Sequence, residues 1–292
     1  MLEGLIVRGV GGFYYVETEN GTYQCRARGL FKKQGITPMV GDRVSVELTE
    51  EEEVEGYVTE IHPRRNAFIR PPIANVDLLL VVAAFRHPAP NLRLIDRFLV
   101  MAQMAGTEAI LCFNKADLAK QEDQETLRRI YGSSYDVLFL SAKTGEGIDD
   151  LTARVSGKQV ALAGPSGVGK STILNHLCQD AAAKTGEVSR KTRRGRHTTR
   201  HVEIFPMDCG GQVFDTPGFT SFDILEAEEA DLAYYYPEMR PFLGQCRFDD
   251  CRHIKEPDCK VREAVENGLI SQERYASYVS QIEEMRARVP YL

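Results

Sequence analysis

The stretch GPSGVGKS runs from Gly164 to Ser171. Its three glycines let the backbone turn its N–H groups inward, and a lysine and a hydroxyl residue close the stretch. The apolar segment QVALAG precedes the loop as an expected strand, and STILNHL begins an expected helix after it. A strand, a glycine-rich loop and a helix N-terminus together form an anion site, so the stretch predicts a phosphate-binding loop in an α/β fold.

Each residue type in this loop has an expected task. Backbone N–H groups face a β-phosphate, Lys170 reaches the β- and γ-oxygens, and the Ser171 hydroxyl is a ligand for Mg²⁺. The loop residues expected to bind nucleotide are Gly164, Pro165, Ser166, Gly167, Val168, Gly169, Lys170, Ser171 and Thr172.

Two further loops, each after an expected strand, indicate which base is bound. In NKAD, Asp117 can accept two N–H bonds from guanine, and adenine offers no such pair of donors. We expect Asn114 to brace the loops and the Lys115 stem to lie along the base. In SAKTG, which follows VLFL, the Ala142 N–H would meet guanine O6. The residues expected at the base are Asn114, Lys115, Asp117, Ser141, Ala142 and Lys143.

The segment DTPG, Asp215 to Gly218, is expected to contact the magnesium ion and the γ-phosphate. Asp215 would hold Mg²⁺ through water, and the Gly218 N–H would meet the γ-phosphate. Upstream, Thr198 and Thr199 are both candidates for a threonine that binds Mg²⁺ and the γ-phosphate, and the sequence does not choose between them.

The order of these parts is unusual, because ordinary GTPases carry the phosphate loop before NKxD. The succession NKAD, SAKTG, GPSGVGKS, HTT and DTPG resembles the circularly permuted GTPases, and looks most like the ribosome small subunit-dependent GTPase A (RsgA) family. The resemblance covers essentially the whole chain. A permuted chain can close the same sheet if its former termini lie close together, and Gly145 to Gly164 would bridge them. We further hypothesise that permutation couples γ-phosphate sensing to the flanking domains, so that domain positions would differ between GDP and a non-hydrolysable GTP analogue.

Three domains are predicted. Residues 1–65 contain about five short strands and indicate a small barrel of the oligonucleotide/oligosaccharide-binding (OB) type, although a purely structural β domain stays open. A linker without regular structure is expected near Pro63 to Pro72. Residues 66–222 would form the permuted GTPase domain, in which strands and helices alternate around a mostly parallel sheet. Residues 223–292 are expected to be helical and irregular.

Three of the seven cysteines and one histidine have a spacing typical of metal ligands and mark a second site: Cys246, Cys251, His253 and Cys259 fall within fourteen residues. Three thiolates and one imidazole make a closed tetrahedral set, which predicts one structural Zn²⁺. The intervening residues are mostly charged, so the metal would supply folding energy that a core cannot. Scattered buried cysteines are the alternative. Cys25, Cys112, Cys178 and Cys209 are expected to be ordinary core or surface thiols.

The position at which many GTPases carry a water-orienting glutamine holds Phe219, which has no polar group. His197, beside the candidate threonines, is the predicted catalytic residue, because an imidazole can donate or accept a hydrogen bond. A solvent-exposed His197, or one that contacts RNA, remains an equal alternative.

Composition limits the remaining choices. The formal net charge is −6, which argues against a polybasic nucleic-acid binder, but residues 190–200 form a local basic run. The N-terminus does not resemble a signal peptide, and the longest apolar run, LLLVVAAF, is too short to span a bilayer, so a cytoplasmic protein is expected.

The family resemblance implies the partners: GTP and GDP, the 30S ribosomal subunit and its 16S rRNA. It implies a GTP hydrolase that the small subunit stimulates and that acts in late 30S maturation, as a monomer and without a membrane. Arg26, Arg28, Lys32 and Lys33 of the β domain are weak candidates for RNA contact. The competing hypothesis is a nucleotide-gated ribosome-binding sensor in which hydrolysis is incidental. A metabolic GTP-using enzyme comes third, because no second substrate site is visible.

Overall fold

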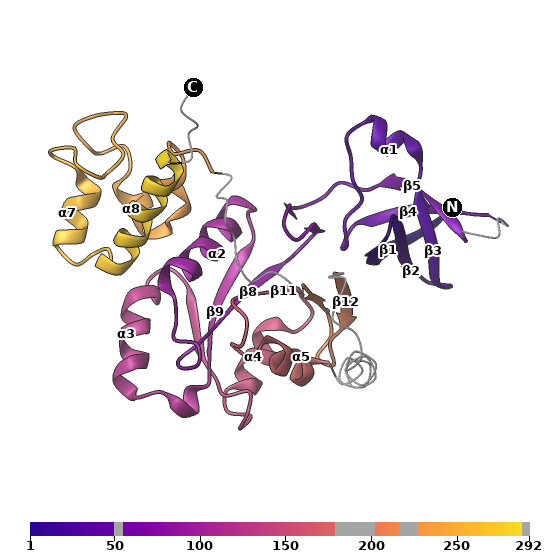
Figure 1. Cartoon of the computed structure of the whole chain (residues 1–292), viewed down its shortest axis with the longest axis horizontal. Coiled ribbons are helices and arrows are strands. Elements are labelled where there is room, and N and C mark those ends of the chain that lie inside the picture. The colour runs from indigo at the N-terminus through magenta and orange to yellow at the C-terminus, as the bar shows by residue number, and fades with distance from the viewer. Residues whose placement is uncertain (50–54, 179–201, 217–226, 288–292) are drawn as a thin grey trace. The chain divides into compact units, whose positions relative to one another are not determined.

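The computed structural model describes residues 1–49, 55–178, 202–216 and 227–287. The contacts of the chain divide it into two compact units, whose elements are labelled in Figure 1. Unit 1 consists of Met1–Leu79, Asp149–Leu162 and Lys170–Phe219. Unit 2 consists of Leu80–Ile148, Ala163–Gly169 and Thr220–Leu292.

The first five strands of unit 1 close into a barrel, as the sequence predicted. The strand order is β1-β2-β3-β5-β4, and β4 returns to pair with β1. Valine and isoleucine side chains, together with one cysteine, fill the interior because alternate residues of each strand point inward. The strands are β1 (Leu2–Val10), β2 (Phe13–Thr18), β3 (Gly21–Ala27), β4 (Arg43–Leu48) and β5 (Gly56–Ile61), with the short helix α1 (Gly29–Lys33) between β3 and β4. The fully buried side chains are Ile6, Val16, Cys25, Val44, Val46 and Val58.

Buried and exposed side chains do not alternate strictly along β4. Val44 and Val46 are buried, but Leu48 is 46% exposed. The register between β4 and β5 shifts between Ser45 and Val46. An irregularity of this kind changes which side chains face the core, and Ser45 is buried as a result.

The segment predicted as an unstructured linker contains a small hairpin instead. Strand β6 (Ala67–Phe68) pairs antiparallel with β7 (Ile73–Ala74), and the prolines occupy the turn between them. The Asn66 side chain closes the hairpin, because its amide donates to the Val76 carbonyl and its oxygen accepts from the Val76 N–H. The prediction failed because it considered the prolines and not the side chain of Asn66.

Beyond the barrel, unit 1 contains the strands that lead to the predicted phosphate and magnesium loops. Strand β11 (Gln159–Ala163) runs parallel to β13 (Gln212–Asp215), and β12 (Glu203–Pro206) runs antiparallel to β13. Helix α4 (Ile148–Val155) precedes β11, and α5 (Lys170–Leu177) follows the loop after it.

Unit 2 carries three neighbouring strands in the order β10-β9-β8. All seven residues of β8 (Leu78–Ala84) are buried, so this strand is covered on both faces. Strand β9 (Glu108–Asn114) pairs in parallel with β10 (Asp136–Phe139). Helix α2 (Leu92–Met104) lies between β8 and β9 in the chain, and α3 (Gln121–Tyr131) lies between β9 and β10. An apolar stripe on α2 is buried at Ile95, Phe98, Leu99 and Ala102, while Leu94 is half-buried.

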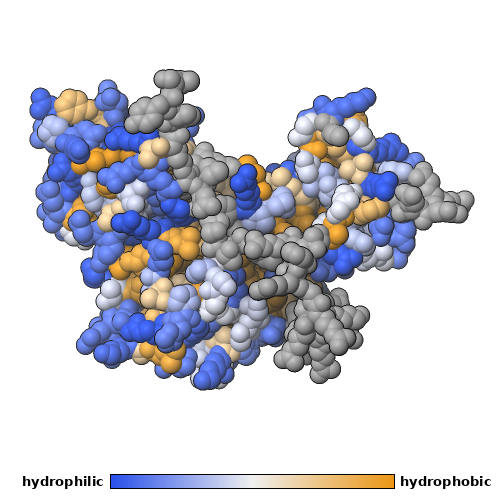
Figure 2. Space-filling view, in the orientation of Figure 1, coloured by the Kyte–Doolittle hydropathy of each residue, from blue (hydrophilic) through white to orange (hydrophobic). Residues whose placement is uncertain are grey.

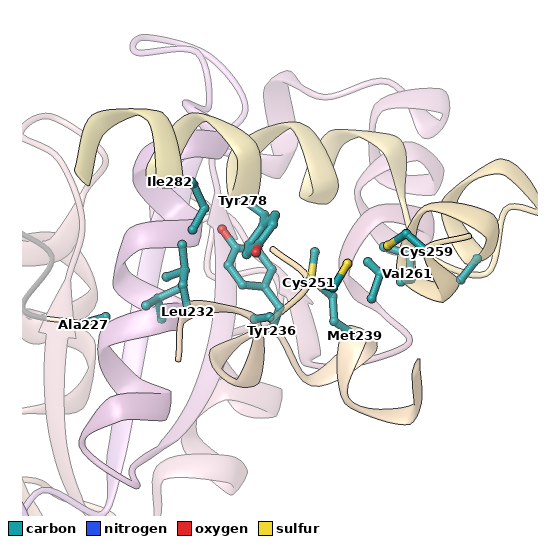
Figure 3. Close-up of a cluster of buried hydrophobic side chains, with 13 residues drawn as sticks. Ala227, Leu232, Tyr236, Met239, Cys251, Cys259, Val261, Tyr278 and Ile282 are labelled. Carbon is teal, nitrogen blue, oxygen red and sulfur yellow. The ribbon is translucent and has the colours of Figure 1, made fainter. Parts of the chain in front are cut away.

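The C-terminal part of unit 2 consists of helices that pack around a small hydrophobic core. They are the 3-10 helices η2 (Leu232–Tyr235) and η3 (Pro237–Phe242), and the α-helices α7 (Lys260–Glu266) and α8 (Gln272–Ala287). Figure 3 shows Tyr236, Tyr278 and Met239 among the side chains that meet between these helices. The surface over α7 and α8 is mostly hydrophilic in Figure 2, with isolated apolar side chains. None of the helices in the described part of the chain is long and apolar enough to cross a bilayer.

Candidate functional site

The predicted phosphate loop follows β11, as expected, and its glycines adopt backbone angles that other residues rarely reach. The φ angles are +139° at Gly164, +81° at Gly167 and +99° at Gly169. Gly169 is also approached closely: a Cβ atom there would lie 2.2 Å from Nδ2 of Asn114. The peptide bond from Gly169 to Lys170 leads directly into α5, so the loop opens a helix of eight residues.

Asn114 joins three loops of unit 2. Its side-chain amide donates to the Val168 carbonyl in the phosphate loop at 2.8 Å. Its Oδ1 accepts from the Ala142 N–H at 2.9 Å, and from the Lys115 N–H at 2.7 Å. Asn114 is 3% exposed, so water cannot replace these bonds readily. The sequence predicted that this residue braces the loops, and the structure places it where it does so.

The Lys115 side chain reaches two backbone carbonyls. Its ammonium group donates to Gly167 O at 2.8 Å and to His87 O. The segment after β8 therefore lies against the phosphate loop, and Pro88 Cδ would be 3.8 Å from a Cβ atom on Gly167. Sequence reasoning did not identify this segment, because neither His87 nor Pro88 belongs to a nucleotide motif. Lys115 itself has a φ of +63°, an angle held by the bonds around it.

The carboxylate expected to read the base lies beside the SAKTG loop. The Ser141 hydroxyl donates to Asp117 Oδ1 at 2.7 Å, and Asp117 is the middle residue of the 3-10 turn η1 (Ala116–Leu118). The Ala142 N–H, predicted to meet guanine O6, donates to Asn114 here, so a bond to the base would be shared with that side chain. Lys143 follows in an exposed position of the same loop.

Within unit 1, Lys170 and Asp215 influence each other electrostatically at the predicted magnesium position. Burial lowers the pKa of Lys170, and the nearby Asp215 carboxylate opposes that effect. Burial raises the pKa of Asp215; the Glu203 carboxylate adds to the rise and Lys170 opposes it. Both carboxylate and hydroxyl oxygens are ligands that Mg²⁺ prefers, and a cation here would relieve the cost of a buried carboxylate. Asp215 and Ser171 therefore suit Mg²⁺ chemically.

Several predicted residues lie outside the described part of the chain. They are His197, Thr198, Thr199, Gly218 and Phe219. The structure gives no position for the predicted catalytic histidine, the two candidate threonines or the γ-phosphate glycine. The residue just before that segment is described: the Thr216 hydroxyl donates to Leu162 O at 2.9 Å and fixes the end of β13 against β11.

The predicted metal ligands converge in unit 2. One ligand atom from each of Cys246, Cys251, His253 and Cys259 lies within 4.8 Å of the others. The Cys246 and Cys259 sulfurs are 3.8 Å apart, and His253 Nδ1 is 3.5 Å and 3.4 Å from them. Zinc bonds of about 2.3 Å to sulfur and about 2.0 Å to nitrogen give tetrahedral edges of about 3.8 Å and about 3.5 Å. The spacing of the donor atoms therefore fits a tetrahedral ion such as Zn²⁺.

Residues outside the ligand set hold the metal loop in shape. The Glu256 carboxylate accepts three backbone N–H bonds, from Arg252, Ile254 and Lys255, at 2.8–3.0 Å. These bonds hold the pKa of Glu256 at about 2 despite the opposing effect of burial. Tyr275 donates to the His253 carbonyl at 2.7 Å, and so supports a ligand directly. Neither Tyr275 nor Glu256 belongs to the cysteine and histidine spacing, so sequence reasoning did not identify them.

A buried arginine connects the C-terminal helices to α2. Arg274, on α8, is 1% exposed. Its Nη1 lies 2.6 Å from Asp96 Oδ1 on α2, and its Nε lies 2.6 Å from Glu238 Oε1 on η3. The guanidinium also lies over the ring of Tyr236, 4.6 Å from the centroid. No sequence motif marks this residue, because an arginine in a charged helix usually points to solvent.

A phosphate loop braced to a guanine-type base loop, in this fold and this order along the chain, defines a circularly permuted P-loop GTPase. A five-stranded barrel precedes it, and helices that carry a Cys₃His cluster follow it. The chain belongs to the RsgA GTPase family. The model of the RsgA GTPase matches residues 61–225, and that of the RsgA N-terminal domain matches residues 3–58.

Individual relatives agree with this assignment. The chain is 46% identical to the small ribosomal subunit biogenesis GTPase RsgA of Caldanaerobacter subterraneus subsp. tengcongensis, over 98% of this chain and 97% of that protein. Among solved structures, it resembles YjeQ from Thermotoga maritima with a TM-score of 0.81 and 35% identity, covering 98% and 99% of the two chains. It also resembles YloQ, described as a circularly permuted GTPase, with a TM-score of 0.79 and 37% identity, covering 100% and 97%.

Proposed function

We propose that this GTPase hydrolyses GTP to GDP and phosphate in the biogenesis of the small ribosomal subunit, and that the 30S subunit stimulates the reaction late in maturation. The observation that carries the nucleotide part is the Asn114 side chain, which bonds to the phosphate loop at Val168 and to the SAKTG loop at Ala142. One buried amide thus fixes the phosphate-binding and base-reading loops to each other.

Guanine would be read by groups that already lie close together. Asp117 accepts N1–H and the 2-amino group, while Ser141 holds its carboxylate in place from the side. The Ala142 N–H contributes to O6 by a bond shared with Asn114. The Lys115 and Lys143 stems would line the base.

The phosphates would lie on the N–H groups of residues 164–172, at the N-terminus of α5. Lys170 would contact the β- and γ-phosphates, and Gly218 the γ-phosphate. Ser171, Asp215 and either Thr198 or Thr199 would hold Mg²⁺. When bound, the ion would neutralise part of the negative charge on the phosphate oxygens. Because Lys170 and Asp215 are both partly buried, their charges act on the phosphates with little screening by water.

The attacking water needs a polar partner, and Phe219 cannot provide one. We assign that role to His197, whose imidazole can accept the water's proton or orient the water. A His197→Ala variant should then lose subunit-stimulated kcat; an unchanged stimulated kcat would remove the residue from the reaction.

The three proposed domains are the barrel at 1–65, the GTPase domain at 66–222 and the helical domain at 223–292. We assign one structural Zn²⁺ to the Cys₃His cluster. The barrel and the basic run at 190–200 would contact 16S rRNA, with a monomer acting in the cytoplasm, where small subunits are assembled. The relative from Caldanaerobacter is named for small-subunit biogenesis, and its identity over nearly the whole chain supports this partner.

The decisive experiment measures phosphate release from GTP and from ATP, with and without purified 30S subunits, under single-turnover conditions. We expect turnover of GTP alone, accelerated at least about tenfold by subunits. Equal binding of ATP would overturn the guanine assignment. Tight, GTP-dependent subunit binding without stimulation would instead support a nucleotide-gated sensor.

A matched pair of variants tests the base contact. In Asp117→Asn, one of the two acceptor oxygens becomes an N–H donor. The site should therefore bind guanine more weakly and xanthine more tightly, because xanthine carries a carbonyl where guanine has its 2-amino group. We expect the affinity for GTP to fall about 100-fold or more. Asp123→Asn, on α3, is the control, because Asp123 bonds to Arg86 and to the Lys120 N–H and takes no part in the proposed base contact.

A further inference from the structure

Glu203 and Asp215 lie opposite each other in the sheet of unit 1. Glu203 begins β12, Asp215 ends β13, and the two residues are register partners in this antiparallel pair. Directly opposed residues project from the same face of a sheet, with Cβ atoms about 4.5–5.5 Å apart. The acidic side chain of Glu203 therefore lies beside the carboxylate that we assign to the magnesium ion.

A barrel residue continues this row. Arg8 of β1 is the register partner of Glu203 in the pair between β1 and β12. Its Nη1 lies 3.9 Å from Glu203 Oε1, and its guanidinium lies over the Tyr15 ring, 3.8 Å from the centroid. Arg8, Glu203 and Asp215 thus form a row of register partners that begins in the barrel and ends at the proposed magnesium position.

Further contacts in the same unit join the barrel to β13 and to the segment around β7. The Asn75 side chain donates to Gly41 O at 2.9 Å, and the Ala74 N–H donates to Val40 O at 2.9 Å. The Phe214 ring, adjacent to Asp215 in the chain, would lie 2.9 Å from a Cβ atom on Gly41. The approach of Phe214 to Gly41 places the barrel beside β13, the strand that pairs with β12.

We propose that Glu203 is a positioning residue for the magnesium site, and that Arg8 of the barrel sets how strongly it acts. This inference rests on the proposed function, because it requires Mg²⁺ at Asp215. Mg²⁺ keeps several of its waters when it binds to proteins, and a second carboxylate on the neighbouring strand can accept hydrogen bonds from them. The positive charge of Arg8 attracts the Glu203 carboxylate, and so weakens the attraction of that carboxylate for the waters of the ion.

The consequence is that the barrel contributes a charge to the nucleotide site. The side chains of Arg8 and Glu203 are 38% and 39% exposed, so the pair is open to water and its effect is moderated by screening. The expected effects are therefore several-fold changes in Mg²⁺ dependence, rather than loss of binding.

The test is the Mg²⁺ dependence of GDP release from the full-length protein, measured with a fluorescent GDP. In Glu203→Gln, we expect the Mg²⁺ concentration for half-maximal slowing of release to rise about 3- to 10-fold. In Arg8→Gln it should fall by a similar factor. The double variant should resemble Glu203→Gln, because Arg8 acts through Glu203, and Glu203→Asp should restore part of the wild-type value.

Controls separate this inference from the proposed function. Glu47→Gln removes a carboxylate from another exposed ion pair of the barrel, the pair with Arg28. This variant should leave the Mg²⁺ dependence of GDP release unchanged. Asp215→Asn should abolish the Mg²⁺ dependence; if it does not, or if the wild type has none, the proposed magnesium site fails and the inference with it. If Asp215→Asn behaves as expected but Glu203→Gln stays within twofold of the wild type, the inference alone is overturned. Thermal unfolding of each variant confirms that it is folded.

Discussion

The side-chain amide of Asn114 donates to the carbonyl of Val168 across 54 positions of the chain, at 2.8 Å. The phosphate loop comes later in this chain than the base loop, yet the contact between them forms. Strand β9 delivers Asn114, and the loop after β11 delivers Val168, so the contact depends on where strands end in space and not on their succession.

Replacing Asn114 by alanine should weaken nucleotide binding. The change leaves the Val168 carbonyl and the Ala142 N–H without their buried partner, at a cost of about 1–3 kcal/mol. We expect the affinities for GDP and GTP to fall about 10- to 100-fold in an equilibrium titration. Asn91→Ala is the control: Asn91 caps α2 through the Leu94 N–H, so its loss should lower stability by about 1 kcal/mol and leave both affinities unchanged. Equal affinities in the two variants would contradict the bracing role.

Replacing Arg274 by methionine should destabilise the protein strongly. Two carboxylates, Asp96 and Glu238, would lose their shared cation in a buried setting, and breaking such a group costs about 3–5 kcal/mol. Urea unfolding at neutral pH measures this loss. Arg129→Met provides the comparison, because Arg129 pairs with Glu273 while 66% exposed, and exposed pairs contribute about 0–1 kcal/mol. A similar loss of unfolding free energy in both variants would contradict a larger contribution from the buried ion pairs of Arg274.

Removing one ligand of the Cys₃His cluster should remove the metal. Cys251→Ser is expected to lower bound zinc from one equivalent to none and to unfold the C-terminal helices at a lower temperature, since structural zinc supplies folding free energy. Metal content and thermal unfolding are the measurements. Cys209→Ser, which changes a thiol outside the cluster, should retain the zinc. Retention of a full equivalent by Cys251→Ser would exclude this site.

The other cysteines should react with thiol reagents in a fixed order. Burial raises the pKa of Cys25 to about 11 and that of Cys178 to about 12, so their thiols stay protonated at neutral pH, where only the thiolate is reactive. Cys209, which is partly exposed, should react first, and the three cluster thiols only after a chelator is added. The labelling rate of Cys25 should keep rising with pH up to about 11. Fast labelling of Cys25 at pH 7 would contradict its burial.

The motifs alone predicted the strands and loops that carry the proposed sites. The segments GPSGVGKS, NKAD and SAKTG each follow a strand, because such loops need a strand end beside them, and the spacing of three cysteines and a histidine predicted a cluster whose atoms do converge. These signals are local, so a single sequence contains them. The predicted catalytic His197 and the threonines beside it remain predictions.

Contacts between distant segments were not predictable in this way. The pairing of Arg8 with Glu203, the bond from Lys115 to His87, and the burial of Arg274 all depend on tertiary packing, which leaves no periodic or motif signal. The β6–β7 hairpin was missed for a related reason, since Asn66 acts through a residue ten positions away.

The bond from Lys115 to the His87 carbonyl also has a thermodynamic consequence. His87 precedes α2 by a few residues, and α2 carries Asp96, which Arg274 binds from α8. If nucleotide binding favours one position of α2, the coupling is reciprocal. A molecule that binds the zinc-bearing helices must then change the affinity for nucleotide by the same factor by which nucleotide changes the affinity for that molecule. An assembling particle that binds the zinc-bearing helices would then change the affinity for GDP without contacting the nucleotide.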